Sequence, residues 1–222
     1  MEWKILFEDE AMLVARKPQG MPTQGDKTGD LDLLSALEAY CGHSLGLIHR
    51  LDRPVGGLLV FAKTKKAEAS FAKQMQAGFL EKRYRAVLCG KLPEEKGTLV
   101  DYLKKNMRTN LSEVVSSKEK TGKKAVLHYE VLQAKKEENQ DLSYVEIRLE
   151  TGRHHQIRVQ TSHAGAPIWG DKKYNPLFQK RGRTEIALWA FALKGYHPIT
   201  NQPWYFEELP VEGIFQLFIG KS

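Results

Sequence analysis

Short apolar runs separated by turn-forming residues recur along the chain, and this pattern predicts a fold rich in strands. Runs in which apolar residues are continuous, or alternate with polar ones, are typical of strands. Residues 57–62, GLLVFA, carry no polar side chain, which favours a central strand covered on both faces. Further strands are expected at 4–7, 12–16, 82–92, 125–134, 142–150, 185–193 and 203–209.

Other segments carry apolar residues at helical spacing. Asp30 can cap a helix that runs to about Tyr40, and Thr64 can cap one that runs to about Gln76. A third helix is expected between Thr151 and Gly165, and a short last one at 212–219. Strands with interspersed helices predict an α/β or α+β fold, with a mixed, largely antiparallel sheet in one domain spanning residues 1–222.

Two charged segments interrupt this pattern. Residues 104–124 are rich in Lys and Ser and poor in large apolar groups, so we expect an exposed, mobile excursion there. The charged residues 135–141 are expected to form a turn between the strands at 125–134 and 142–150.

Composition narrows the class of protein. The 222 residues are 41% hydrophobic and 27% charged, which is ordinary for a soluble globular protein. The net charge of +7 suits an anionic partner such as nucleic acid, although many basic proteins bind none. The two cysteines do not have the spacing of a metal site, which indicates reduced thiols. The acidic residues near the N-terminus interrupt the apolar core that a signal peptide would need. We therefore expect a cytoplasmic protein with no membrane contact.

The first candidate for chemistry is Asp52, in the turn HRLDR ahead of the apolar run. Neighbouring cations favour its ionised form, which suits a nucleophile or a proton acceptor. The competing interpretation is a capping residue or a surface ion pair. Gly56 and Gly57 follow, and their lack of side chains lets another backbone or a ligand approach closely. From residue 50 to residue 85, nine Lys or Arg stand against three acids, as an anion-binding cleft requires.

The second candidate is TGRHHQIR, which gathers several hydrogen-bond donors within a short stretch. Thr151 and Gly152 would leave the start of the helix open for an anion. A solvated basic face is the alternative. A metal site at His154 and His155 is disfavoured, because adjacent helical residues point in different directions and no HExxH spacing exists.

The third candidate is Tyr84, which lies between Arg83 and Arg85. A strand tyrosine usually belongs to a core, but here its ring could meet a base while its neighbours meet phosphates. The sequence has no Walker loop, dinucleotide fingerprint or metal-ligand cluster, so we expect neither a metal nor an organic cofactor.

The chain resembles the RluA-type pseudouridine synthases in five blocks that occur in the family's order. The blocks are ILFEDEAMLVARKPQGMPT, GLIHRLDRPVGGLLVFAKT with the HRLD signature, EKRYRAVLCG, TGRHHQIRVQTSHAGAPIWGD, and IALWAFAL followed by HP. The resemblance implies the pseudouridine synthase fold with a central basic cleft. It also implies isomerisation of uridine to pseudouridine in structured RNA, either tRNA or rRNA.

The resemblance also implies roles for residues. Asp52 takes the place of the catalytic aspartate, which attacks the sugar or the base or removes a sugar proton. Arg158 falls on the arginine that pairs with this aspartate, and Tyr84 on the tyrosine that contacts the base and helps remove the C5 proton. RNA contacts are expected from His49, Arg50, Arg53, Arg83, Arg85, Arg153, His155, Gln156 and, on the 104–124 excursion, Lys123 and Lys124.

The sequence departs from the family pattern at several positions. Pro54, Val55 and Gly56 replace the usual x-Thr-Ser of the signature loop, and no S4-like module is expected before the catalytic domain. Two other functions stay open at this point. One is a non-catalytic RNA-binding protein that keeps the fold, and the other is a metal-dependent nuclease that uses His154, His155 and His163. We expect a monomer, although the sequence leaves the oligomeric state open.

Overall fold

The computed structural model describes residues 2–137, 140–182 and 184–219. The chain forms two compact units. The first contains residues 2–82 together with Trp189–Leu209, and the second contains Arg83–Leu188 together with residues 210–219. The single domain expected over residues 1–222 stays a prediction.

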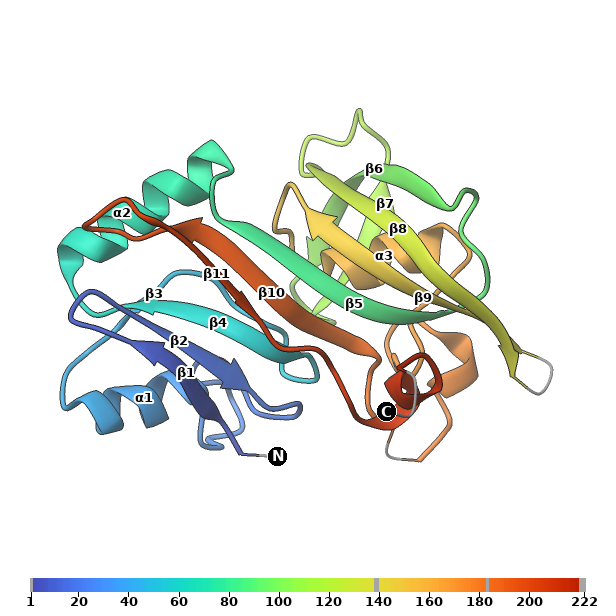
Figure 1. The fold of residues 1–222 in the computed structure, drawn as a ribbon. Helices are drawn as coiled ribbons and strands as arrows, with labels where there is room; N and C mark the ends of the chain where they lie inside the picture. The colour runs from blue at the N-terminus through green and yellow to red at the C-terminus, as the bar shows by residue number, and fades with distance from the viewer. Residues whose placement is uncertain (1, 138–139, 183, 220–222) are drawn as a thin grey trace. The chain divides into compact units, whose positions relative to one another are not determined.

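The first unit holds strands from both ends of the chain (Figure 1). Its strands are β1 (Lys4–Glu8), β2 (Met12–Lys17), β3 (Gly46–Leu47), β4 (Gly56–Ala62), β10 (Leu188–Tyr196) and β11 (Pro203–Glu207). Its helices are α1 (Leu33–Cys41) and α2 (Lys65–Ala77). The sheet is mixed, because β4 runs antiparallel to β2 and β3 but parallel to β10.

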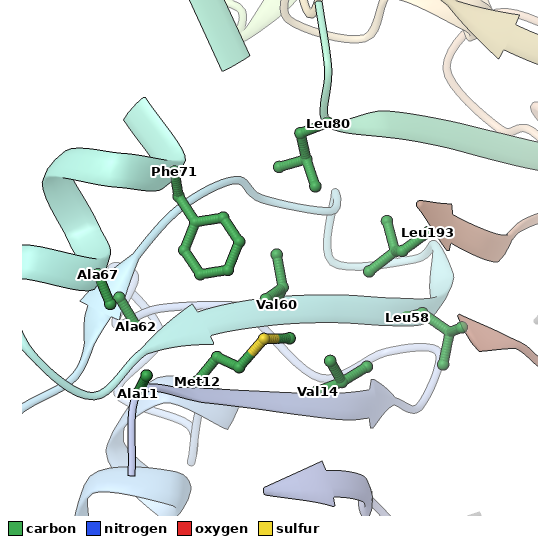
Figure 2. Packing of buried hydrophobic residues seen from close by; sticks show 10 residues of the cluster. All are labelled: Ala11, Met12, Val14, Leu58, Val60, Ala62, Ala67, Phe71, Leu80 and Leu193. Atoms are coloured by element: carbon green, nitrogen blue, oxygen red, sulfur yellow. The ribbon is translucent and has the colours of Figure 1, made fainter. Parts of the chain in front are cut away.

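Strand β4 is the centre of this unit, as its unbroken apolar run predicts. Every residue of β4 is buried. One set of its side chains packs with β2 and with Phe71 of α2, and Figure 2 shows the Phe71 ring reaching from α2 toward Val60. Helix α1 lies on the other side of the strands from α2 (Figure 1). Because both faces of β4 are covered, the position of the turn that precedes it is fixed by the core.

Gly56 and Gly57 permit the parallel pairing of β4 with β10. A Cβ atom on Gly57 would lie 2.2 Å from the carbonyl oxygen of Ala190, and one on Gly56 would lie 2.2 Å from the Trp189 ring. Gly57 also has a φ of +121°, a backbone conformation that residues other than glycine rarely adopt. The prediction that these glycines allow a close approach is confirmed: backbone of Ala190 approaches Gly57, and the Trp189 ring approaches Gly56.

The helices of this unit begin at polar caps. Thr64 accepts a hydrogen bond from the backbone N–H of Ala67 and starts α2, as predicted. Helix α1 begins two residues later than expected. Its cap is Asp32, whose carboxylate accepts from the N–H of Ser35, whereas Asp30 binds Arg53 instead.

The second unit is built from antiparallel strands. They are β5 (Glu81–Cys89), β6 (Lys96–Asn106), β7 (Leu111–Val115), β8 (Lys123–Glu137) and β9 (Gln140–Leu149), in the spatial order β5-β9-β8-β6-β7. Helix α3 (Gln156–His163) and the 3-10 helices η1 (Pro176–Phe178) and η2 (Gly213–Leu217) complete it. The predicted pairing of β8 with β9 is confirmed, but both strands extend into the segment expected to be a turn. Residues 138–139 of that turn lie outside the described residues.

Residues 104–124 contain more regular structure than their composition predicts. The end of β6 and the whole of β7 form a hairpin with pairs from Tyr102–Val115 to Asn106–Leu111. The hairpin is held by packing of Leu103 and Val114 against Val159 of α3, a contact that is distant in sequence and leaves no periodic signal. Mobility and RNA contact of this hairpin stay predictions.

The third helix is shorter than expected. Helix α3 begins at Gln156, and His155 precedes it in the left-handed conformation with a φ of 54°. The expected helix start at Thr151 is therefore wrong, because the left-handed residue reverses the chain direction before the helix begins.

Candidate active site

Asp52 lies in a tight turn between β3 and β4. Its side chain is half-buried, and its backbone carbonyl accepts a hydrogen bond from the N–H of Val55 at 2.9 Å. The turn leads directly into the buried strand β4. A rigid strand behind a partly exposed carboxylate is the arrangement that a catalytic loop requires.

Residues 17–23, called here the 17–23 segment, hold the Asp52 turn from both sides. On one side, Thr23 Oγ1 donates to the Leu51 carbonyl at 2.8 Å and accepts from the Leu51 N–H at 3.2 Å. On the other side, the N–H of Gly20 donates to the Arg53 carbonyl at 2.9 Å. The residues before and after Asp52 are thus fixed by hydrogen bonds to one segment.

Lys17 also binds this turn from within the protein. Its side chain is fully buried, and Nζ donates to the carbonyls of Pro18 (3.0 Å), Met21 (2.7 Å) and Arg53 (3.2 Å). Burial lowers the pKa of Lys17 to about 7, and the charge of Asp52 opposes that decrease. Lys17 lies in the first family-like block, within KPQG, but no pattern in the sequence indicates that it is buried under the Asp52 turn.

Arg53, predicted to hold a phosphate, is bound by acidic residues of a neighbouring loop. Its guanidinium contacts Asp30 and Asp26, the latter at 3.4 Å, and donates to Thr28 Oγ1 at 2.9 Å. Hydrogen bonding to Asp30 raises the pKa of Arg53, and the bond to Arg53 lowers the pKa of Asp30. A phosphate at Arg53 would therefore compete with these carboxylates. Arg50, two residues before Asp52, is exposed.

His49 is buried under this turn instead of facing solvent. Its Nε2 accepts from the N–H of Val60 on β4 at 3.4 Å. Burial, with a smaller effect of the Lys82 charge, lowers the pKa of His49 to about 3, so the ring is neutral at pH 7. This position suits support of the turn, and direct RNA contact by His49 would need the side chain to leave the core.

Arg158 belongs to a buried ion pair in the second unit. Its Nε lies 2.8 Å from Asp171 Oδ2 and its Nη2 lies 2.8 Å from Asp171 Oδ1, so the contact has two parallel hydrogen bonds. The guanidinium also lies over the Tyr174 ring, 5.2 Å from its centroid. Asp171 ends the fourth family-like block, but the pattern alone assigned it no role.

Tyr84 lies on β5, buried, and pairs in register with Ile147 on β9. Side chains alternate between the faces of a strand, so Arg83 and Arg85 point to the opposite face from Tyr84. Both arginines contact the carboxylate of Glu146, at 3.3 Å and 2.5 Å. Contact of Tyr84 with a base and of its two neighbours with phosphates stays a prediction, and those phosphates would have to lie on the opposite face of the strand from the base.

The two histidines before α3 do not diverge as the helical spacing predicts. The rings of His154 and His155 stack with their centroids 3.8 Å apart, because His155 adopts the left-handed conformation. His155 Nδ1 lies 2.7 Å from the Tyr174 hydroxyl, and burial lowers the pKa of His155 to about 2. His155 thus has a structural hydrogen bond in addition to any contact with RNA.

Gln156 is buried, and its amide is used inside the protein. Its Oε1 accepts from Thr151 Oγ1 (2.8 Å) and from the N–H of Arg153 (2.9 Å), while Nε2 donates to the Val126 carbonyl (3.0 Å). The expected contact of Gln156 with RNA stays a prediction, and it would have to occur in addition to this internal role. The expected anion site at Thr151 and Gly152 does not lie at the start of a helix, since α3 begins at Gln156, and Gln156 already binds the Thr151 hydroxyl.

The remaining predicted RNA contacts lie on the surface of the second unit. Arg153, Lys123 and Lys124 are exposed, and Arg153 Nε donates to the Lys124 carbonyl at 2.9 Å. Asp52 belongs to the first unit, and Tyr84 and Arg158 belong to the second. Their assembly into one basic cleft stays a prediction.

Among residues 2–137, 140–182 and 184–219, no group of three or more His, Cys, Asp or Glu side chains is arranged to hold a metal ion. No helix in the same ranges has the length and apolar character needed to cross a membrane.

Solved structures of pseudouridine synthases share this fold. The human RNA pseudouridylate synthase domain containing 1 aligns over 98% of this chain and 93% of its own chain, with a TM-score of 0.78 and 22% identity. The human RNA pseudouridylate synthase domain containing 4 aligns over 93% of this chain and 88% of its own, with a TM-score of 0.71 and 22% identity. The predicted pseudouridine synthase fold is confirmed.

Sequence comparison identifies the family. Residues 11–163 match the model of a family described as RNA pseudouridylate synthase. The uncharacterized RNA pseudouridine synthase YhcT of Bacillus subtilis is 36% identical over 90% of this chain and 66% of its own length. The ribosomal large subunit pseudouridine synthase D of Zymomonas mobilis is 35% identical over 93% of this chain and 69% of its own length. The chain belongs to the RluA-type RNA pseudouridylate synthase family, and the predicted enzyme class, an isomerase, is confirmed. It spans about two thirds of the length of these two relatives.

Proposed function

We propose that the chain converts uridine to pseudouridine in a structured RNA, with Asp52 as the catalytic group. The bond from ribose C1′ to uracil N1 breaks, the base turns, and C1′ bonds to C5. The C5 proton is then removed and N1 gains a proton. Substrate and product are isomers, so the reaction needs no oxidant, reductant or second substrate.

The observation that carries the proposal is the match of residues 11–163 to the family, a range that contains Asp52, Tyr84 and Arg158. The local geometry of Asp52 supports it further. A half-buried carboxylate is presented by a turn whose flanking residues, Leu51 and Arg53, are both hydrogen-bonded to the 17–23 segment. Such restraint reduces the cost of aligning a reacting group.

Tyr84 and Arg158 have supporting roles in this proposal. Arg158 orients the Asp52 carboxylate, and its two-point contact with Asp171 fixes the plane of the guanidinium that does so. Tyr84 contacts the uracil and assists removal of the C5 proton. A base in a folded RNA must leave its stack before these groups reach it, which costs a few kcal/mol.

Ribosomal RNA is the substrate class that the relatives favour over tRNA. The synthase of Zymomonas mobilis and one of Neisseria meningitidis, 34% identical over 98% of this chain, are both named for the large ribosomal subunit. The exposed cations Arg50, Arg153, Lys123 and Lys124 would hold phosphates that flank the target uridine.

The decisive experiment replaces Asp52 with Asn or Ala and measures pseudouridine formation and RNA binding in the same preparation. We expect loss of product with RNA affinity nearly intact. Asp141→Asn is the control, because Asp141 is an exposed carboxylate paired with Lys91 at 3.8 Å in the other unit. Undiminished product from Asp52→Asn would refute a catalytic Asp52. If the wild-type protein binds RNA but forms no pseudouridine, the non-catalytic RNA-binding alternative is correct.

A second experiment identifies the substrate. Pseudouridines are mapped across total RNA from cells with and without the gene. We expect at least one site in large-subunit ribosomal RNA to disappear, whereas loss of a site in tRNA alone would contradict the ribosomal assignment.

A further inference from the structure

Lys17 is a lysine with no exposed surface, and its Nζ donates hydrogen bonds to three backbone carbonyls. Burying an ammonium group costs free energy unless hydrogen bonds satisfy it. A neutral amine has two N–H groups and an ammonium has three. The three acceptors, on Pro18, Met21 and Arg53, therefore match the charged form of Lys17.

These contacts join the end of β2 to the turn that presents Asp52. The Arg53 carbonyl accepts from Lys17 Nζ at 3.2 Å and from the Gly20 N–H at 2.9 Å. The Pro18 and Met21 carbonyls belong to the 17–23 segment itself, so Lys17 shapes that segment and also attaches it to the turn. Thr23 completes the attachment on the other side, at Leu51.

Charges on the turn act on Lys17 as well. The negative charge of Asp52 raises the pKa of Lys17 against the effect of burial, and the positive charge of Arg53 lowers it.

We propose that Lys17 is a positioning residue for Asp52, and that the buried ammonium of Lys17 fixes the carbonyl of Arg53 and thereby the turn that presents Asp52. This inference rests on the proposed function, in which Asp52 is the catalytic group. Because Lys17 lies inside the protein, it acts through the turn and not through contact with RNA.

The test compares Lys17→Met with Thr23→Val and with Lys63→Met as a matched control. Lys63 is a largely buried lysine just beyond the far end of β4, paired with Glu8 at 2.5 Å. Misplacement of a catalytic group lowers kcat, so we expect Lys17→Met to lower kcat about tenfold or more, with KM for RNA changed less than about threefold. Thr23→Val should lower kcat by a smaller factor, and Lys63→Met should leave both parameters unchanged.

Amide hydrogen exchange gives a readout that does not depend on activity. The N–H groups of Gly20, Leu51 and Val55 make the hydrogen bonds of the turn, and we expect their exchange to accelerate in Lys17→Met and Thr23→Val but not in Lys63→Met. Should Lys17→Met fail to fold, Thr23→Val decides, and wild-type kcat with wild-type exchange then overturns the inference.

Two further outcomes are informative. A fall in kcat/KM of Lys17→Met that arises entirely from KM would overturn the inference, because a positioning role predicts a loss in kcat. Unchanged activity of Asp52→Asn would instead overturn the proposed function, even if exchange at the turn accelerates in Lys17→Met.

Discussion

Arg158 and Asp171 form a buried ion pair in which two guanidinium nitrogens meet two carboxylate oxygens, each at 2.8 Å. The side chains are 4% and 0% exposed. Removal of one partner from a buried pair leaves an uncompensated charge in a poorly solvated place, which usually costs about 3–5 kcal/mol. This pair therefore links the stability of the second unit to the orientation of a predicted catalytic arginine.

Asp171→Asn keeps the shape of the side chain and removes its charge. We expect the free energy of unfolding to fall by about 3–5 kcal/mol, measured by urea denaturation. Lys91 and Asp141 form an exposed pair, so Asp141→Asn serves as a control with an expected change below about 1 kcal/mol. Equal effects of the two substitutions would show that the buried pair has no special contribution.

Arg158→Ala and Arg153→Ala separate catalysis from RNA binding. Arg158 is buried, whereas Arg153 lies on the surface. We expect Arg158→Ala to lower kcat far more than RNA affinity, and Arg153→Ala to weaken RNA binding severalfold with little change in kcat. Single-turnover rates and binding curves at fixed salt provide the measurement. If catalysis by Arg158→Ala falls only in proportion to its RNA affinity, Arg158 has no catalytic role.

The buried histidines predict loss of stability in acid. The pKa of His49 is lowered to about 3 and that of His155 to about 2, both from a usual value near 6.5. From pH 6.5 downward the unfolded chain binds protons that the native state does not, so the free energy of unfolding falls as pH falls toward 3. Their contribution is fully present above pH 6.5. At pH 5 each of these two histidines lowers the free energy of unfolding by about 2 kcal/mol relative to its value above pH 6.5.

His155→Gln tests this dependence. The difference in unfolding free energy between pH 7 and pH 5 should be about 2 kcal/mol smaller in this variant than in the wild type. His163, whose side chain is 58% exposed, supplies the control, and His163→Gln should retain the wild-type difference. A wild-type pH dependence in His155→Gln would show that His155 is not a buried neutral group in solution.

Local signals predicted much of the fold. Strand β4 was predictable because a continuous apolar run requires cover on both faces, and the Thr64 cap because its hydrogen bond reaches only three residues ahead. Strand β7 was not predictable, since its position depends on packing of Val114 against α3. Hairpin residues that are held by distant contacts need no periodicity of their own.

The candidate site also combines residues that local sequence signals predict with residues whose contacts join distant segments. The run HRLDR singles out Asp52, because this carboxylate lies among cations directly ahead of an apolar run. The sequence does not reveal that Lys17 lies under this turn or that Asp171 binds Arg158, since both contacts join separate segments. Gln156 was assigned to RNA contact because composition cannot distinguish a donor that faces solvent from one used internally.

Asp26 and Asp30 bind the guanidinium of Arg53, beside Asp52. The double variant Asp26→Asn, Asp30→Asn should release Arg53 for phosphate. We expect RNA affinity to rise and the slope of log K against log salt to steepen by about one unit. Glu94→Gln, Glu95→Gln removes two exposed acids from the other unit and has the same net charge. Equal gains in RNA affinity in both double variants would show that the change in net charge alone explains the effect.

Tyr174 attaches the β6–β7 hairpin to the loop that precedes α3. Its hydroxyl accepts from the N–H of Ser112 on β7 at 2.7 Å and lies 2.7 Å from His155 Nδ1. Tyr174→Phe leaves both groups without this partner, which we expect to cost about 1–3 kcal/mol. If the hairpin contacts RNA as predicted, KM for RNA should also rise more than kcat falls.

Tyr102→Phe is the matched control for this substitution. Tyr102 lies on β6 in the same hairpin, paired with Val115 of β7, and is half-buried. Amide exchange at Ser112 and along β7 should accelerate in Tyr174→Phe and stay at the wild-type rate in Tyr102→Phe. Accelerated exchange without a change in KM would show that the hairpin is held by Tyr174 but does not contribute to RNA binding.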